Sequence, residues 1–220
     1  SAIGNTGVGT GVFGALTTGD NNVAVGLNAL DVMTTAAQNT AIGACALAAT
    51  TTGGCNTGVG YLSLKTNIDG TNNVAMGRCA LGSNTTADNN TAVGFLALTS
   101  NTTADNNTAV GNLALCKNTT GSENTAVGIQ ALCKTTTGCR NTAVGASALV
   151  CNTEGCENVA MGRNAMRCNT TGDGNLGIGA YALGANTTAD SNTAVGKSAL
   201  TNNTTGEQNT AVGVCSLNAN

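Results

Sequence analysis

The chain has 220 residues and a formal net charge of −3, with 2% aromatic and 9% charged residues. It contains 31 Gly but no Pro, His or Trp. Without a basic cluster, nucleic-acid binding has no electrostatic basis, and no run of about 18 apolar residues could form a membrane-spanning helix. Without His, a Ser or Cys nucleophile lacks its usual base. We therefore expect no enzyme activity and no cofactor or metal.

A 17-residue repeat runs through the whole chain without insertion or deletion. Gly recurs at every seventeenth position from Gly9 to Gly213, and an Asn stands four places before each of these glycines. If this Asn is position one, the consensus is N-T-A-V-G-x-x-A-L-x-x-N-T-T-G-x-x. A polar composition can indicate disorder, but this strict order argues against it, and a fixed period is the signature of a repeat architecture.

The repeat is too short for a pair of helices, which need about 33 residues. Frequent Gly and Asn, with Thr and Val between them, are typical of short strands and tight turns. One unit cannot bury its own apolar face, so the units must stack. We therefore predict an all-β fold, a parallel β-solenoid (β-roll or β-helix) with 17 residues per coil and about 13 coils. Residues 1–220 would form a single domain without caps.

Each coil begins with the Asn at position one, which we expect to form a ladder by bonding to the Asn of the coils above and below. The predicted ladder comprises Asn5, Asn22, Asn39, Asn56, Asn73, Asn90, Asn107, Asn124, Asn141, Asn158, Asn175, Asn192 and Asn209.

The next positions of the coil assign its faces, because alternate strand residues point to opposite sides. We expect Val at position four and Thr at position two to point inward, with Leu at position nine as the facing core layer and position thirteen as a third inward slot. Gly at position five would provide a turn that a Cβ would obstruct. Position three would then face outward, yet it is never larger than Ala. Either another chain packs closely on this face or the coil curves tightly there.

The run Val-Ala-Met-Gly-Arg-Cys-Ala at 74–80, with its NTAVGxxAL relatives, resembles the head repeats of trimeric autotransporter adhesins, which read roughly N-S-V-A-I-G-x-x-A. The residues that match this frame in order are Asn73, Val74, Ala75, Met76, Gly77 and Ala80. The repeat is also similar to the NTAVG arrays of phage tail-fibre-like and bacterial surface proteins. The adhesin unit is shorter than the repeat of this chain. The resemblance implies a left-handed roll, a trimer of chains side by side, and an extracellular fibre or adhesin stalk.

Six of the ten cysteines fall into three pairs whose members share a position one coil apart. The pairs are Cys116 with Cys133, Cys139 with Cys156, and Cys151 with Cys168. Adjacent strands lie about 4.8 Å apart, within the Cα separation that a disulfide accepts. We predict three disulfides between coils, which implies an oxidising extracellular compartment.

Two alternatives remain for these thiols: free cysteines that pack as small apolar residues, or a clustered all-thiolate metal site. Four further cysteines, Cys45, Cys55, Cys79 and Cys215, have no neighbour in the same column. They are candidates for bonds between chains, or are free.

Acidic residues stack at position sixteen, where Asp88 precedes Asp105, and Asp173 precedes Asp190 and Glu207. They could hold Ca²⁺ or be solvated turn residues, and the latter is favoured because no Ca²⁺ loop pattern occurs.

The polar columns offer two other readings. Sequons at Asn84, Asn101, Asn118, Asn169, Asn186 and Asn203 matter only in a cell that glycosylates. Thr columns at positions thirteen and fourteen resemble those of ice-binding solenoids, although adjacent Thr cannot both face outward. Carbohydrate binding through Tyr61, Phe95 and Tyr181 is weaker, because they form no common platform.

The sequence shows no capping segment at either end, so we expect either a trimmed array or coils that pair head to tail in an open filament. We therefore predict a structural extracellular fibre-forming protein, secreted, on a cell surface or on a virion, whose partner is itself as a homo-oligomer, filament or trimer. The alternative is an adhesin or a phage tail-fibre receptor-binding rod with a cell-surface glycan or receptor as its partner, and ice binding is a minor possibility.

Overall fold

The computed structural model describes residues 1–218 and contains thirteen short strands. They form two compact units, residues 1–107 with β1–β6 and residues 108–220 with β7–β13. The first unit holds β1 (Thr6–Val8), β2 (Val23–Val25), β3 (Thr40–Ile42), β4 (Thr57–Val59), β5 (Val74–Met76) and β6 (Thr91–Val93). The second holds β7 (Thr108–Val110), β8 (Thr125–Val127), β9 (Thr142–Val144), β10 (Val159–Met161), β11 (Leu176–Ile178), β12 (Thr193–Val195) and β13 (Thr210–Val212).

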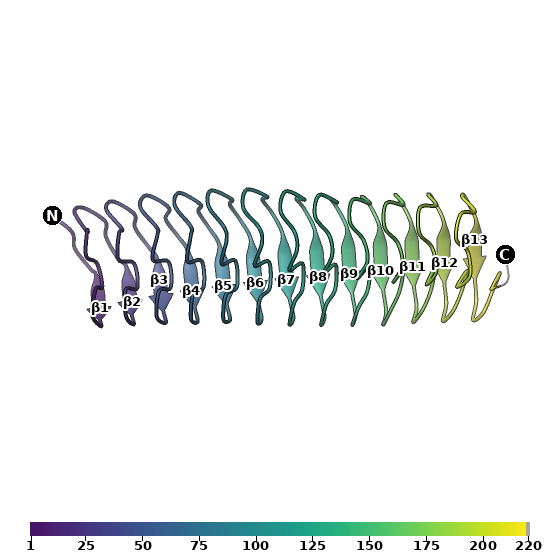
Figure 1. Cartoon of the computed structure of the whole chain (residues 1–220), viewed down its shortest axis with the longest axis horizontal. Coiled ribbons are helices and arrows are strands. Elements are labelled where there is room, and N and C mark those ends of the chain that lie inside the picture. Colours follow the sequence, from purple (N-terminus) through teal and green to yellow (C-terminus); the bar gives the residue numbers. More distant parts are fainter. Residues whose placement is uncertain (219–220) are drawn as a thin grey trace. The chain divides into compact units, whose positions relative to one another are not determined.

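Within each unit every strand pairs in parallel with the next strand in sequence (Figure 1). Thr125 lies opposite Thr142 in the pairing of β8 with β9, and in the other described pairs each residue likewise lies opposite its equivalent one repeat further on. The chain also stacks outside the strands, for example through a 3.0 Å bond from the N–H of Leu132 to the carbonyl of Ala148. The predicted parallel β-solenoid, with one sequence repeat per coil, is therefore confirmed, and residues 1–218 contain no helix. The handedness stays a prediction.

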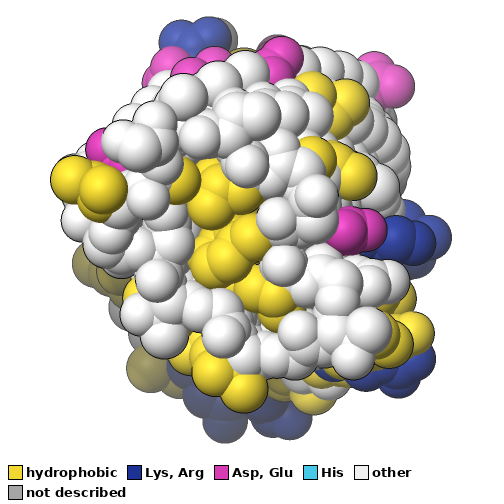
Figure 2. Space-filling model, turned by 90° about the vertical axis from the view of Figure 1, so that its left-hand side faces the viewer, with side chains coloured by type: hydrophobic (Ala, Val, Ile, Leu, Met, Phe, Trp, Pro, Cys, Tyr) yellow, Lys and Arg dark blue, Asp and Glu magenta, His cyan; other side chains and the backbone are white. Residues whose placement is uncertain are grey.

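The core of each coil is narrow and consists mainly of Ala and Leu. In the coil that carries β8, Ala126, Ala131 and Leu132 are fully buried, and they occupy positions three, eight and nine. Position nine was predicted to be inside, and that is confirmed. In Figure 2, which looks at the first unit from the end where the chain starts, hydrophobic side chains fill the middle of the visible face.

The predicted orientation of positions two, three and four is wrong. Val127 at position four is 36% exposed, whereas Ala126 beside it is fully buried. Successive strand residues do point to opposite sides, as predicted. The residue that points inward, however, is the small one at position three. Little room is left on the inner side of position three. A Cβ added to Gly58, which occupies this position, would lie 3.1 Å from the Ser63 Oγ and 3.4 Å from the Leu47 Cδ1. The small size of position three thus reflects the tight coil, and no other chain is needed to explain it.

Position thirteen is also not the inward slot that we predicted. Ile68, the one apolar residue in this column, is 42% exposed. The Thr hydroxyls of the column donate to the carbonyl of the equivalent residue one coil further on, as Thr119 does to Thr136 at 3.0 Å. Position twelve is the buried one instead, with Asn152 and its equivalents fully inside. A Thr column that donates to backbone carbonyls leaves fewer hydroxyl protons for ice.

Left-handed backbone conformations form the corners of every coil. The Gly at position five has a φ between 124° and 142°, as in Gly128 at 132°, which confirms the predicted glycine turn. A Cβ on Gly128 would lie 2.7 Å from the carbonyl carbon and oxygen of Gly145 in the next coil. The core Leu at position nine also has a positive φ, 51° for Leu132, which a non-glycine residue adopts only when its surroundings hold it there.

Candidate functional site: the stacked side-chain columns

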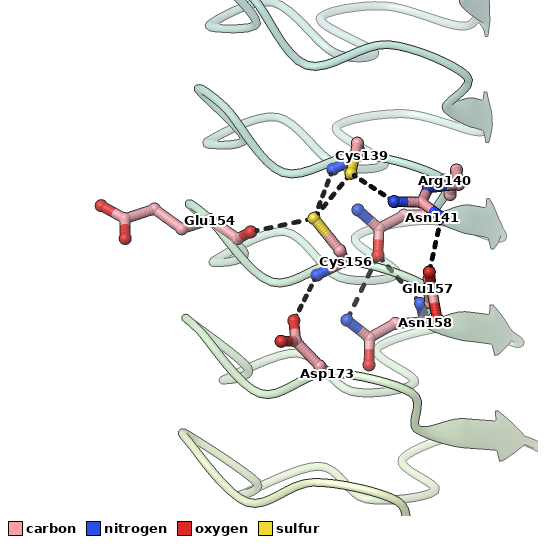
Figure 3. Close-up of polar contacts among 8 residues, drawn as sticks. All are labelled: Cys139, Arg140, Asn141, Glu154, Cys156, Glu157, Asn158 and Asp173. Carbon is pink, nitrogen blue, oxygen red and sulfur yellow. Dashed lines mark hydrogen bonds and ion pairs between the residues drawn. The ribbon is translucent and has the colours of Figure 1, made fainter.

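The predicted ladder at position one is present. In the second unit, the backbone N–H of Asn158 donates to the Oδ1 of Asn141 at 3.0 Å, and the Nδ2 of Asn158 lies 3.2 Å from the same atom (Figure 3). The Nδ2 of Asn158 also donates to the carbonyl of Gly172 in its own coil at 2.7 Å, and its Oδ1 accepts from the backbone N–H of Asn175 in the next coil at 2.9 Å. In the first unit, Asn56 and Asn73 repeat the backbone bond at 2.9 Å. Each amide therefore joins three successive coils.

A second Asn ladder lies at position twelve, and sequence reasoning missed it. The Nδ2 of Asn169 donates to the Oδ1 of Asn152 at 3.0 Å and to the carbonyl of Gly172 at 2.9 Å. In the first unit, Asn84 donates to Asn67 in the same way at 2.7 Å. The signal was the recurrent Asn of the N-T-T triplet. We interpreted it as a sequon, although its regular spacing equals that of position one.

This second ladder changes the meaning of the sequons. The asparagines of the six N-T-T sequons are at most 2% exposed: Asn84, Asn101, Asn118, Asn169, Asn186 and Asn203. A side-chain amide that is buried and donates to a carbonyl cannot carry a glycan in the folded coil. The triplets therefore serve stacking, whichever cell produces the chain.

The Asp residues of position sixteen also stack, and their carboxylates accept hydrogen bonds from the backbone. The Oδ1 of Asp88 accepts from the N–H of Thr71 at 2.6 Å, and Asp105 accepts from the N–H of Asp88 at 2.8 Å. In the second unit, Asp190 accepts from the N–H of Asp173 at 2.8 Å. Each carboxylate thus binds a backbone donor one coil earlier. This supports a structural role for these acids in the turn.

Two of the three predicted cysteine pairs bring their sulfur atoms together. The Sγ atoms of Cys116 and Cys133 lie 2.9 Å apart, and those of Cys139 and Cys156 lie 2.8 Å apart. All ten cysteines are free thiols in the structure. The disulfides therefore stay predictions, with two pairs already in contact.

The third pair, Cys151 and Cys168, lies along another column. The backbone N–H of Cys151 donates to the carbonyl of Arg167, the neighbour of Cys168, at 3.2 Å. The Sγ of Cys151 is 3.8 Å from the Nζ of Lys134. The Cys151 thiol therefore lies beside a cation one coil earlier.

Figure 3 shows the groups around Cys139 and Cys156: Arg140 lies beside Cys139, and Asp173 lies beside Cys156 one coil further on. The N–H of Cys139 donates to the Cys156 Sγ at 3.0 Å, and the N–H of Cys156 donates to Asp173 at 2.6 Å. Burial, the hydrogen bond with Cys139 and the nearby Asp173 carboxylate raise the pKa of the Cys156 thiol to about 11. Beside the pair, Arg140 and Glu157 form a 2.7 Å ion pair on the surface.

The other four cysteines do not form a common group. Cys55 is exposed and contacts the Oε1 of Gln38 at 3.2 Å, and Cys215 is exposed as well. Cys45 and Cys79 are partly buried. Their predicted role in bonds between chains stays a prediction.

The surface also carries an open pocket and two stacked cation–aromatic pairs. Arg78 lies 5.6 Å from the ring centre of Phe95, and Arg163 lies 5.0 Å from that of Tyr181. A pocket of about 430 Å³ is lined by Thr120, Ser122, Glu123, Thr137, Cys139 and Arg140.

Comparison of the chain with protein-family models, with curated proteins and with solved structures finds no match. Residues 1–218 also include no helix that is long and apolar enough to cross a lipid bilayer.

Proposed function

We propose that the chain is a structural protein of an extracellular fibre, in which copies of the same chain associate side by side. The observation that carries this proposal is the pair of buried Asn ladders. Buried amides are stabilising only when they are fully hydrogen-bonded, and here their partners are the neighbouring coils. The Asn of position one, present in every repeat, and the recurrent Asn of position twelve therefore serve to continue the stack, which is what a structural element requires.

The outer face of the strands supports association between copies. Its position-four residues expose between 36% and 44% of their surface, in Val25, Ile42, Met76, Val110, Val127 and Met161. None of the thirteen strands contains a charged residue. Two such faces can therefore approach without bringing like charges together, and β-branched residues lose little side-chain entropy on packing.

The size of this face explains why many coils would be needed. A three-residue strand presents about 10 Å along its length and about 4.8 Å across, so one coil contributes about 48 Å². A standard interface takes about 800 Å² from each partner, which corresponds to about 17 coils. A single unit would associate weakly, whereas a long array of coils would associate firmly. Extracellular location rests on the predicted disulfides between coils, which persist in oxidising compartments.

A charge introduced on the outer face tests this proposal. We expect the chain to form oligomers or fibres in sedimentation and electron microscopy, and the Val127→Glu variant to remain a monomer. The matched control is Thr137→Glu, which places the same charge at an exposed position outside the strands. Circular dichroism would verify that both variants fold. A wild-type chain that stays monomeric at high concentration, or a Val127→Glu variant that assembles normally, would contradict the proposal.

The second candidate is a binding rod of the adhesin or tail-fibre type. It is favoured by the cation–aromatic pairs of Arg78 with the exposed Phe95 and of Arg163 with the partly exposed Tyr181, because such pairs can stack on the apolar face of a sugar. Retention of the chain on a glycan array, lost in the Tyr181→Ser variant, would support it. If no glycan on the array retains the chain, the binding-rod candidate is contradicted and only the structural proposal remains.

A further inference from the structure

Positions ten and eleven of the second unit form a strip that combines thiols with cations. Its members, here called the basic thiol strip, are Cys116, Lys117, Cys133, Lys134, Cys151, Arg167 and Cys168. Successive coils are joined here through the backbone: the N–H of Lys117 donates to the carbonyl of Cys133 at 3.1 Å, and the N–H of Cys151 to that of Arg167 at 3.2 Å. Between residues 116 and 218 these two positions hold no carboxylate. The strip is therefore locally positive in a chain whose net charge is negative.

Within the strip, Cys116 and Cys133 are in contact but differ in access to solvent. Cys116 is only 4% exposed, whereas Cys133 is partly exposed. Their sulfur atoms lie 2.9 Å apart, and the Cys116 Sγ is also 3.4 Å from the carbonyl of Cys133. An incoming reagent would therefore meet Cys133 first and find Cys116 directly behind it.

The two thiols of this pair differ in acidity, and Cys133 is the more acidic one. The hydrogen bond with Cys116 and, to a smaller extent, the cations Lys117 and Lys134 lower the pKa of the Cys133 thiol to about 7, against the effect of burial. The same hydrogen bond raises the pKa of Cys116 far above its ordinary value. At neutral pH about half of the accessible sulfur is thus the thiolate, which is the nucleophilic form, and the buried sulfur keeps its proton.

The pair in Figure 3 provides an internal comparison. Cys139 and Cys156 have almost the same sulfur separation, 2.8 Å. However, Asp173 accepts from the backbone of Cys156, and the pKa of Cys156 is raised to about 11. Arg140 is paired with Glu157, and its guanidinium also lies 3.9 Å from the Cys139 Sγ. Two thiol pairs of almost equal spacing therefore differ in their surroundings: both have a cation nearby, but only Cys156 also has a carboxylate beside it.

We propose that Cys133 and Cys116 form a thiol–disulfide exchange site for small disulfides that carry carboxylates. The Cys133 thiolate attacks one sulfur of the small disulfide, forms a mixed disulfide and releases the other half as a thiolate. That thiolate takes the Cys116 proton, and the Cys116 sulfur then attacks Cys133 Sγ and displaces the second half, which is protonated by water. Two protein thiols are oxidised to one disulfide, and one small disulfide is reduced to two thiols.

The cations of the strip account for the substrate class. Lys117, Lys134 and Arg167 would attract the carboxylates of an anionic disulfide, and no acidic residue of the strip would repel them. A disulfide that carries ammonium groups would be repelled by the same charges. The proposal does not depend on fibre formation, because every residue of the site lies within one unit.

Oxidation of the reduced full chain at pH 7, with trapping of thiols and peptide mass mapping, tests the proposal. With oxidised glutathione we expect the Cys116–Cys133 disulfide to form at least tenfold faster than Cys139–Cys156. In the Cys116→Ser variant the mixed disulfide should accumulate on Cys133. The Lys117→Gln/Lys134→Gln double variant should slow the reaction with oxidised glutathione severalfold more than the reaction with cationic cystamine, because loss of thiolate affects both reactions but loss of attraction affects only the first. Equal rates for the two pairs, or initial attack by Cys116, would overturn the proposal.

A second measurement needs no variant. Alkylation of Cys133 in the wild-type chain by iodoacetamide should reach half its maximal rate near pH 7, because only the thiolate reacts. In a peptide with a free cysteine, alkylation should reach half its maximal rate at about pH 8.5, the ordinary pKa of a thiol. Coincident pH profiles would show that Cys116 and Cys133 are only a structural pair.

Discussion

The Oδ1 atom of Asn124 accepts a hydrogen bond from the backbone N–H of Asn141, one coil further along the chain, at 3.0 Å. In the same way, the Oδ1 of Asn141 accepts from the backbone N–H of Asn158. The Nδ2 of Asn141 donates to the carbonyl of Gly155 at 2.8 Å. These amides are almost completely buried. A buried polar group without a partner is costly, so each Asn is held in place by the coils before and after it.

The first prediction concerns Asn141. The Asn141→Ala variant removes the acceptor of the Asn158 N–H and the donor to Gly155, so we expect a loss of about 2–4 kcal/mol in the free energy of unfolding. Urea unfolding followed by circular dichroism measures it. The control is Asn202→Ala, because Asn202 is exposed. If the two variants are equally stable, the ladder does not contribute as we argue.

The second prediction follows from a gap in the ladder at position twelve. Thr135 is fully buried there between the coils of Asn118 and Asn152, and its hydroxyl has no hydrogen-bond partner. In the Thr135→Asn variant, Nδ2 would reach the Gly138 carbonyl, as the equivalent Asn152 reaches Gly155 at 2.9 Å. We expect a gain of about 1 kcal/mol.

The thermal midpoint measures this gain. Thr137→Asn is the matched control, since it makes the same exchange at an exposed position and should leave the midpoint almost unchanged. A lower midpoint for Thr135→Asn would mean that the column cannot accept a longer side chain in this coil.

The sequence predicted the fold because its period is strict. A Gly and an Asn at every seventeenth residue indicate parallel stacked coils, and both the ladder at position one and the glycine turn follow from that register. The faces of the strand did not follow. Hydrophobicity ranks Val above Ala for the core, but space at position three is limited by position eight of the same coil and position nine of the previous coil, as Ser63 and Leu47 show for a Cβ added to Gly58.

Two features of the site could not be predicted for physical reasons. The Leu at position nine has a positive φ, as in Leu132, although propensity disfavours that conformation for Leu. The acidity of Cys133 depends on a hydrogen bond with the Cys116 thiol across coils and on two nearby lysines. The shared repeat position predicted the contact of Cys116 with Cys133. The difference in thiol pKa between this pair and the pair Cys139 with Cys156 could be seen only from the side-chain positions.

The third prediction concerns the glycine turn. In Gly128→Ala the new methyl group would lie 2.7 Å from the carbonyl of Gly145, and φ would have to stay near 132°. We expect a loss of at least about 3 kcal/mol, because steric overlap adds to backbone strain. Chemical denaturation would quantify it. Gln130→Ala serves as control: Gln130 is exposed, and its φ of 57° is shared with many residue types at position seven. A Gly128→Ala chain as stable as this control would show that the turn can relax.

The fourth prediction tests the register itself. Deletion of residues 124–140 removes one complete coil, so that position seventeen of one coil still precedes position one of the next and every column continues. Deletion of residues 124–139 leaves Arg140 as one extra residue between Glu123 and Asn141, which shifts the columns unless a turn absorbs it. In a stack of coils that contact mainly their neighbours, stability is approximately a sum over repeats.

We therefore expect the 17-residue deletion to fold with a thermal midpoint a few degrees below that of the full chain, and the 16-residue deletion to lose much more. Circular dichroism under reducing conditions measures both, since these deletions also remove Cys133 and Cys139. The two deletion variants differ by a single residue, so composition cannot account for a difference between them. Equal midpoints would mean that the coils tolerate a change of period, and that the strict 17-residue spacing has a cause other than the hydrogen-bonded columns.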